Sequence, residues 1–317
     1  MRAAAALLLL FALTGAGPVC DAVWHDAARN RDLPVKIRLP EGSGRVPVVL
    51  FSPGLGGTIT GGALWGSAWA ARGFAVVHLQ HPGSDAAVYA GATDAADRRA
   101  KVRAAATPEQ LAARVADAGF VVDELGRRRS EGTCDLSRLD LRRLGIAGHS
   151  MGAWTAQALA GQRYGNDKAP FADPRFIAAI AFSPAALVAG DPAASFGGVT
   201  IPVFSITGTA DGLVPSGPKT TPEVRARREA AAAADRTGPF AGMPPGNKYL
   251  LVFDGAGHMA FAGRAGLAKT NPHVAEVTTA ATSAFWGATL LGDARDAAFL
   301  KTDLRGELAP GDRYESK

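Results

Sequence analysis

Cysteine is scarce in this chain, which has only two cysteines, Cys20 and Cys134, among its 317 residues. Two cysteines are too few for the disulfide framework that holds a small secreted scaffold together. Neither stands in a motif of thiol chemistry, so we expect no cysteine nucleophile. The pair is compatible with one disulfide, but only if both residues remain in the exported protein, and the sequence leaves this open.

Long hydrophobic runs are also lacking beyond the first residues. Residues 3–13 form an eleven-residue apolar run behind a single arginine, followed by small residues. Such a run is too short to span a bilayer and is typical of a secretory signal. Residues 14–16 offer one cleavage site and residues 19–22 a later one. We predict a signal peptide over residues 1–22, a secreted or periplasmic location and no membrane span.

Charge of one sign is only slightly in excess, with 34 Lys and Arg against 29 Asp and Glu and a net charge of +5. The basic residues gather in three groups, 98–103, 127–129 and 225–228, and each group has acidic residues nearby. No zinc-finger, RNA-binding or basic-zipper signature accompanies them. We interpret the groups as solvated helix faces and expect no nucleic-acid partner.

Short apolar runs alternate with amphipathic or alanine-rich stretches along the rest of the chain. The runs predict strands near 33–39, 46–52, 74–80, 143–149, 176–183, 201–207 and 248–254. The stretches predict helices near 62–72, 107–126, 151–162, 221–235 and 273–291. This alternation indicates an α/β protein with a mostly parallel sheet and helices on both faces. The length predicts a single domain over 23–295 and a polar C-terminal tail over 296–317.

One pentapeptide, Gly148-His149-Ser150-Met151-Gly152, fits the G-x-S-x-G nucleophile elbow. An apolar run precedes it and an alanine-rich stretch follows, as a strand, a sharp turn and a helix require. The flanking glycines are needed because neighbouring segments crowd such a turn. A plain strand-to-helix turn is the alternative interpretation of the same residues.

Two histidines follow Ser150 far enough along the chain to leave room for an acid between. His258 lies in a glycine-rich loop after an apolar strand, whereas His273 lies at the start of the last predicted helix. A loop at the carboxyl end of a strand can place an imidazole beside the serine. We therefore predict His258 as the general base, with a turn-capping histidine as the alternative.

Asp211 is the candidate acid, because it follows the apolar strand 201–207 in a loop. Asp254 is the second candidate, but it lies only four residues before His258, where a turn role suits it better. Asp173 and Asp191 stand beside prolines and are typical turn or cap residues. Asp211 is itself followed by glycine, so a turn aspartate is the alternative interpretation.

These residue types fit nucleophilic acyl chemistry. A serine hydroxyl needs a neutral imidazole to take its proton, and a carboxylate orients that imidazole. The developing oxyanion needs backbone donors. The Met151 amide is one candidate, and the Leu55 amide, in the loop 52–57 after the strand 46–52, is the other. That loop matches no nucleotide-phosphate motif.

Four segments with these candidates, SPGLGG, GHSMG, GTADGLVP and GAGHMAF, together with residues 76–83 resemble one family. The chain is similar to secreted bacterial α/β-hydrolases of the dienelactone-hydrolase-like type, related to platelet-activating-factor acetylhydrolases and more loosely to cutinases. The resemblance implies an α/β-hydrolase fold and no cofactor. It implies Ser150 as nucleophile, Asp211 as acid and His258 as base, with Leu55 and Met151 as oxyanion donors.

Two positions depart from the relatives. Dienelactone hydrolases carry a cysteine nucleophile where this chain has Ser150, so dienelactone is not the expected substrate. Ala153 stands where cutinases usually carry a second glycine. We expect an exported serine hydrolase of small or polymeric carboxylic esters. An amidase, a thioesterase, an acyltransferase, a non-catalytic binding protein of the same fold and a cell-surface interaction protein remain alternatives.

The substrate pocket is the least defined part of the prediction. We assign Trp65, Trp69, His81 and Gly56 to it, with core packing as the alternative for the tryptophans. His78 and His81 are spaced like metal ligands, but no third ligand is evident, so we expect no metal. Segments 84–106, 184–199 and 236–247 fit no simple β-α unit. They are predicted to shape the pocket, with ordinary surface loops as the alternative.

Overall fold

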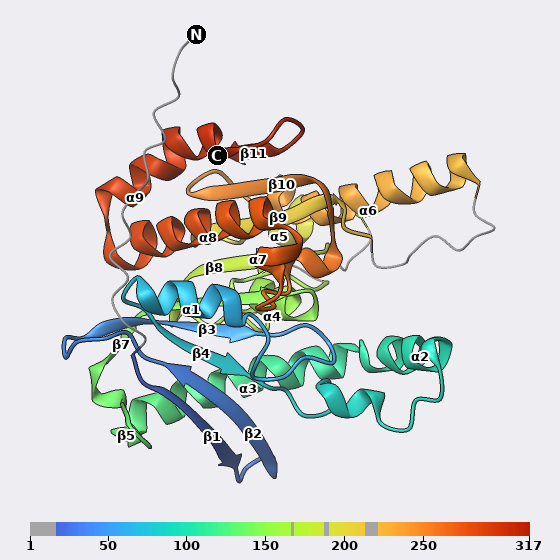
Figure 1. The fold of residues 1–317 in the computed structure, drawn as a ribbon. Helices are drawn as coiled ribbons and strands as arrows, with labels where there is room; N and C mark the ends of the chain where they lie inside the picture. The colour runs from blue at the N-terminus through green and yellow to red at the C-terminus, as the bar shows by residue number, and fades with distance from the viewer. Residues whose placement is uncertain (1–16, 166–167, 187–189, 213–220) are drawn as a thin grey trace.

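The computed structural model describes residues 17–165, 168–186, 190–212 and 221–317 of the chain. Within these residues, nine strands form one sheet in the order β1-β2-β4-β3-β7-β8-β9-β10-β11 (Figure 1). Their bounds are β1 Val19–Asp26, β2 Arg31–Arg38, β3 Val46–Ser52, β4 Ala75–Leu79, β7 Leu139–His149, β8 Phe176–Phe182, β9 Val203–Ala210, β10 Lys248–Gly257 and β11 Arg313–Ser316. A separate two-stranded ribbon pairs β5 Ser130–Glu131 with β6 Cys134–Asp135.

The six strands from β4 to β10 in this order run parallel to one another, while β1, β2 and β11 are antiparallel additions at the two edges. Strand β3 explains why the central strands read as unbroken apolar runs. Its residues Val48 and Leu50 join one hydrophobic cluster, and Val49 and Phe51 join the other. Both faces of the strand are therefore buried, as in a parallel sheet covered on two sides.

Helices cover both faces of the sheet (Figure 1). The longer ones are α1 Ala63–Ala71, α2 Ala95–Ala105, α3 Pro108–Arg127, α4 Met151–Leu159, α6 Pro222–Gly242 and α8 Pro272–Trp286. Short helices are α5 Pro192–Phe196, α7 Leu267–Thr270 and α9 Ala294–Ala298, and single turns are η1 Ala86–Tyr89, η2 Leu136–Arg138, η3 His258–Phe261, η4 Gly287–Leu291, η5 Phe299–Asp303 and η6 Leu304–Glu307. Helices α1 and α8 pack on one face, and α3 and α4 on the other. The mixed α/β class with a mostly parallel sheet is confirmed.

The two ends of the described chain differ from the prediction. Strand β1 begins at Val19, inside the predicted signal segment 1–22, and pairs with β2 over its whole length. Strand β11 lies inside the predicted polar tail 296–317 and pairs with β10. In the sequence, β11 looks polar because Tyr314 is the single aromatic residue among its four residues. In the fold, that one aromatic side chain is buried. Both ends therefore extend the sheet.

The N-terminal strand is also bonded covalently to the two-stranded ribbon. A disulfide joins Cys20 of β1 to Cys134 of β6. In the part of the chain that is described, no helix has the length and apolar character needed to cross a membrane.

The three segments without a simple β-α pattern contain short or peripheral elements. Turn η1 and helix α2 lie in 84–106, helix α5 lies in 184–199, and the last turns of α6 lie at the start of 236–247.

Candidate functional site

Ser150 lies on a sharp turn between the end of β7 and the start of α4. Its backbone has φ 56° and ψ −118°, a positive φ that a residue with a side chain adopts only under local constraint. A Cβ added at Gly148 would lie 2.0 Å from the Gly152 carbonyl oxygen, and one added at Gly152 would lie 1.9 Å from the Ser52 carbonyl oxygen. The turn therefore admits no larger residue than glycine at either flanking position.

An unbroken chain of hydrogen bonds runs from Ser150 to a buried carboxylate. The Ser150 Oγ lies 3.0 Å from Nε2 of His258. The other ring nitrogen of His258, Nδ1, lies 2.7 Å from Oδ1 of Asp211. The His258 side chain is 18% exposed, whereas that of Asp211 has no exposed surface. This geometry allows the imidazole to take the serine proton while the carboxylate fixes its orientation.

Asp211 is held by groups from three elements. The Thr207 hydroxyl donates to its Oδ2 over 2.8 Å, and Nε of Arg236 lies 3.5 Å from its Oδ1. Burial by itself would raise the pKa of Asp211, but the hydrogen bond to His258 and the charge of Arg236 outweigh it and leave the pKa below its usual value. Arg236 also donates to the backbone carbonyls of residues 211, 183 and 184. The acid therefore stays ionised at neutral pH.

His149 packs under the candidate base. Its Nε2 lies 3.0 Å from the carbonyl oxygen of His258, and the two rings are 4.8 Å apart. Burial lowers the pKa of His149 to about 3, so the ring is neutral and its Nε2–H donates to that carbonyl. A Cβ added at Gly54 would lie 3.1 Å from the other ring nitrogen. His149 thus connects the loop of the candidate base to the loop of the predicted oxyanion donor.

The Met151 amide directly follows Ser150 in the chain, and the loop of the other predicted oxyanion donor, Leu55, packs against the serine. A Cβ added at Gly54 would be 3.4 Å from the Ser150 Cβ, so the loop of Leu55 lies directly against the serine. Among the described residues, neither the Leu55 amide nor the Met151 amide has a hydrogen-bond partner. The Met151 amide also lies at the N-terminus of α4, where the helix dipole favours negative charge. Both amides are available to an external acceptor.

The segment after β4 shapes that loop. Tyr89 donates its hydroxyl to the Leu55 carbonyl over 3.3 Å, and the Gly56 amide donates to the Ser84 carbonyl over 2.8 Å. Gly56 has φ 76°, and a Cβ there would lie 1.9 Å from the Tyr89 hydroxyl. Gly56 thus lies beside the candidate site, partly exposed, and its role as a pocket residue stays a prediction.

Trp65 and Trp69 do not lie at the surface of the site. Both are fully buried on the face of α1 that packs against the sheet and α8. The Trp65 ring stacks on Phe182, and the Trp69 indole N–H donates to the Thr282 hydroxyl over 2.9 Å. A side chain without exposed surface cannot line a pocket open to a substrate. The predicted pocket role is therefore contradicted for both tryptophans, which belong to the core.

His81 and His78 are likewise buried. His81 bridges Ser52 and Asp117, at 3.0 Å and 2.9 Å, and its burial contradicts a pocket-lining role. Nδ1 of His78 lies 2.8 Å from the Gly61 carbonyl oxygen. Within the described ranges, no group of three His, Cys, Asp or Glu residues has the arrangement of a metal site.

The alternative candidates have other partners. His273 lies 2.6 Å from Asp312, and Asp254 accepts a hydrogen bond from Thr209. Neither is paired with Ser150 or His258. The sequence did not identify Arg236 and Tyr89, because no local motif marks a side chain that contacts the site from a distant segment. It also gave no role to His149, which stands at a variable position of the G-x-S-x-G pattern.

The carboxyl ends of β3, β7, β9 and β10 therefore gather a serine, an imidazole, a carboxylate and two unpaired amides at one edge of the sheet. No protein-family model and no curated protein sequence matches this chain. An assignment of function consequently depends on the geometry of these residues.

Proposed function

We propose that this protein is an exported serine hydrolase that cleaves carboxylic esters. The observation that carries the proposal is the hydrogen-bonded chain from Asp211 through His258 to Ser150, on a turn with a positive φ at the serine. A serine that merely caps a helix requires neither the imidazole nor the buried carboxylate behind it. Two unpaired amides beside the hydroxyl complete what acyl chemistry needs.

In the proposed reaction, Ser150 Oγ attacks the ester carbonyl carbon while its proton passes to Nε2 of His258. The carbonyl oxygen becomes an anion that accepts hydrogen bonds from the Leu55 and Met151 amides. When the tetrahedral intermediate collapses, His258 gives the proton to the departing alcohol. Water, deprotonated by His258, then attacks the acyl-enzyme and releases the acid and the free serine. No step uses a cofactor.

The arrangement of the elements supports an α/β-hydrolase fold. The nucleophile, acid and base occur in the order Ser, Asp, His along the chain, which is the order of that fold. They follow β7, β9 and β10 of a mostly parallel sheet. The disulfide between Cys20 and Cys134 supports export, because such bonds persist in oxidising compartments.

The test is hydrolysis of p-nitrophenyl esters from acetate to palmitate by the purified protein. Ser150→Ala removes the nucleophile, and Ser43→Ala, at an exposed serine before β3, is the matched control. We expect the wild type and Ser43→Ala to be active and Ser150→Ala to lose at least about 10³-fold in kcat. The chain-length optimum then measures the acyl pocket.

Activity that survives in Ser150→Ala would show that the serine is not the nucleophile. A wild type that is inactive on every ester would also contradict the proposal. In that case, labelling of Ser150 by a fluorophosphonate separates two explanations. Labelling indicates an active triad for another acyl class, such as amides or thioesters, and its absence indicates an inactive site.

A further inference from the structure

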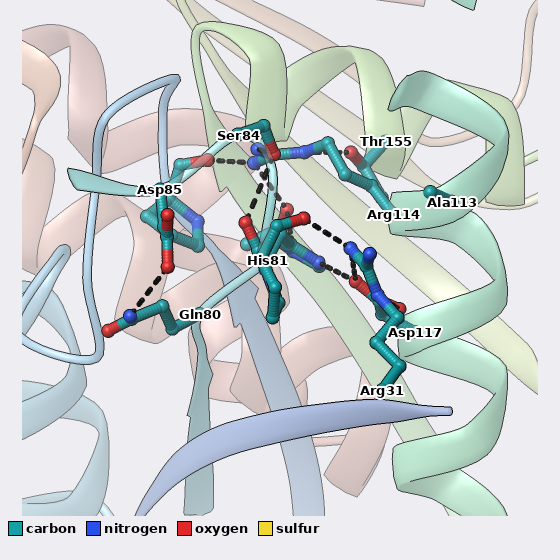
Figure 2. A network of polar contacts seen from close by, with 12 residues as sticks. Arg31, Gln80, His81, Ser84, Asp85, Ala113, Arg114, Asp117 and Thr155 are labelled. Carbon is teal, nitrogen blue, oxygen red and sulfur yellow. Dashed lines mark hydrogen bonds and ion pairs between the residues drawn. The ribbon is translucent and has the colours of Figure 1, made fainter. Parts of the chain in front are cut away.

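A buried polar network surrounds Arg114, His81 and Asp117 (Figure 2). At its centre is Arg114 of α3, whose side chain has no exposed surface. Its Nε donates to the Thr155 hydroxyl over 3.2 Å, and Nη1 donates to the Ser84 hydroxyl over 2.8 Å. Its Nη2 donates to the Ser52 hydroxyl over 3.2 Å and to the Pro53 carbonyl oxygen. One guanidinium thus joins α3 to three other segments of the chain, at residues 52–53, 84 and 155.

Two of these segments carry the predicted oxyanion donors. The Pro53 carbonyl lies two residues before Leu55, in the same loop. Thr155 lies on the first turns of α4 and donates its hydroxyl to the Met151 carbonyl over 3.1 Å. The third acceptor, Ser84, also receives the Gly56 amide on its carbonyl oxygen. Arg114 therefore links the loop that carries the Leu55 amide to the helix that begins with the Met151 amide.

Among the described residues, Arg114 forms no ion pair in direct contact, although the charge of Asp117 offsets part of the effect of burial on its pKa. Its four acceptors are neutral oxygens, and the nearby carboxylate of Asp117 is engaged by Arg29, Arg31 and His81 instead. Burial lowers the pKa of Arg114 to about 9, so the guanidinium remains protonated at neutral pH. A buried cation without an ion-pair partner is costly to stability, so its presence beside this site calls for a compensating role.

The neighbouring Ser52, His81 and Asp117 repeat the residue types of the candidate site in the same hydrogen-bonded order. All three are almost completely buried, so no substrate reaches them. Burial lowers the pKa of His81 to about 4, which keeps its ring neutral between the hydroxyl and the carboxylate. This second array is therefore a support for Arg114 and the loop rather than a second nucleophile.

We propose that Arg114 is a positioning residue of the oxyanion site. It fixes the Leu55 loop against the first turn of α4, and its charge adds to the positive potential where the oxyanion forms. The inference rests on the proposed esterase function and assigns a role to a residue that does not touch the substrate.

The experiment compares Arg114→Met and Arg114→Lys with a matched control, Arg138→Met. Arg138 is also buried and also donates to backbone carbonyls, those of residues 40, 41 and 44, but at the opposite end of β3. We expect Arg114→Met to lower kcat by about 10²-fold with KM within about twofold. Arg138→Met is expected to keep kcat even where its Tm falls. Arg114→Lys retains the charge but not the forked contacts, so its kcat should lie between that of the wild type and that of Arg114→Met.

A spectroscopic measurement separates oxyanion stabilisation from general damage. An aryl trifluoromethyl ketone adds to Ser150: the Oγ bonds to the carbonyl carbon, the proton passes to His258 and the carbonyl oxygen becomes an anion. The ¹⁹F NMR shift of this adduct, followed against pH, gives the pKa of the hemiketal oxygen. We expect that pKa to rise by about one unit in Arg114→Met and to stay unchanged in Arg138→Met. A merely structural role would not move it.

If Arg114→Met does not fold, Thr155→Val and Ser84→Ala decide the question, since each removes one anchor and leaves the guanidinium in place. Each is expected to lower kcat by about tenfold. The inference is overturned if these two variants, or a folded Arg114→Met, keep the kcat and the hemiketal pKa of the wild type. It is also overturned if Arg138→Met loses as much kcat as Arg114→Met. A wild type without Ser150-dependent hydrolysis overturns the proposed function together with this inference, whereas an active wild type with indifferent variants overturns this inference alone.

Discussion

Asp211 is the residue on which the orientation of His258 depends. It faces His258 Nδ1 at 2.7 Å and is held by Thr207 and Arg236 from behind. Because the Asp211 side chain is fully buried, water does not compete with His258 for that oxygen. An amide in place of this carboxylate would present a donor to the same ring nitrogen and favour the wrong tautomer.

We therefore predict that Asp211→Asn lowers kcat by roughly 10³- to 10⁴-fold while the protein remains folded. The matched control is Asp254→Asn, because Asp254 lies near the end of β10, just before His258, but bonds Thr209 instead of His258. Steady-state hydrolysis of p-nitrophenyl butyrate and a circular dichroism spectrum measure the two effects. Equal losses in both variants would contradict the assignment of the acid.

The difference between Asp211 and Arg114 shows what a sequence can reveal at this scale. Asp211, Ser150 and His258 each stand directly after an apolar strand in a short motif, so local patterns identify them. Arg114 lies in the middle of an amphipathic helix and bonds Ser52, 62 residues away. Its helical spacing from Leu111 and Ala118 places it on the apolar face, but its hydrogen-bond partners are known only once the chain is folded.

The same contrast holds for whole elements. Helix α3 has an apolar stripe that includes Leu111, Ala118 and Leu125, all buried, so its periodicity predicted it. Helix α2 buries no residue at all, and its start is fixed by the Asp94 carboxylate accepting the amides of residues 96 and 97. A helix without a buried face has no periodic signal. The sequence pattern therefore places these residues in an irregular segment.

Edge strands escape prediction for a related reason. β11 contributes one buried side chain, Tyr314, whose ring stacks on Tyr249 and whose hydroxyl donates to the Leu300 carbonyl over 2.8 Å. Four residues with one anchor make no alternating pattern. Pairing with β10, rather than the local sequence, holds this strand in the sheet.

Tyr314→Ala is expected to destabilise the protein by about 3 kcal/mol, because it empties a buried aromatic site and leaves the Leu300 carbonyl unpaired. Urea unfolding measures the loss. The control is Glu315→Ala, one residue further along the same strand. The Glu315 side chain is half-exposed, so this change is expected to alter stability by less than about 0.5 kcal/mol. A Tyr314→Ala variant as stable as the wild type would indicate that β11 does not pair with β10 in solution.

For the molecule as a whole, the N-terminal strand constrains where an exported chain can begin. Cleavage after residue 22 would remove Val19–Ala22, half of β1, together with the cysteine bonded to Cys134. Cleavage after Ala16, the earlier of the two predicted sites, leaves both intact. We therefore predict a mature N-terminus at Gly17.

Intact mass spectrometry of the exported protein tests this position. Under non-reducing conditions, the mass should correspond to a chain from Gly17 with one disulfide. The variant Ala16→Gln, which blocks the small-residue site, should slow processing, whereas Ala22→Gln should not. A mature chain that begins at Val23 would contradict the prediction and would leave Cys134 without its partner.

The stability of the whole molecule should fall in weak acid. His78, His81 and His149 are buried, and burial lowers their pKa values from the usual 6.5 to about 4, 4 and 3. Between pH 6.5 and pH 4 the unfolded chain therefore binds protons that the folded chain does not, so stability decreases as the pH falls. Each histidine contributes a loss on the order of 2 kcal/mol between pH 7 and pH 5.

Urea unfolding at pH 7, 6 and 5 measures the slope of the unfolding free energy against pH. His78→Gln, away from the candidate site, should make this slope shallower. Equal stability of the wild type at pH 7 and pH 5 would show that these rings are not buried in their neutral form.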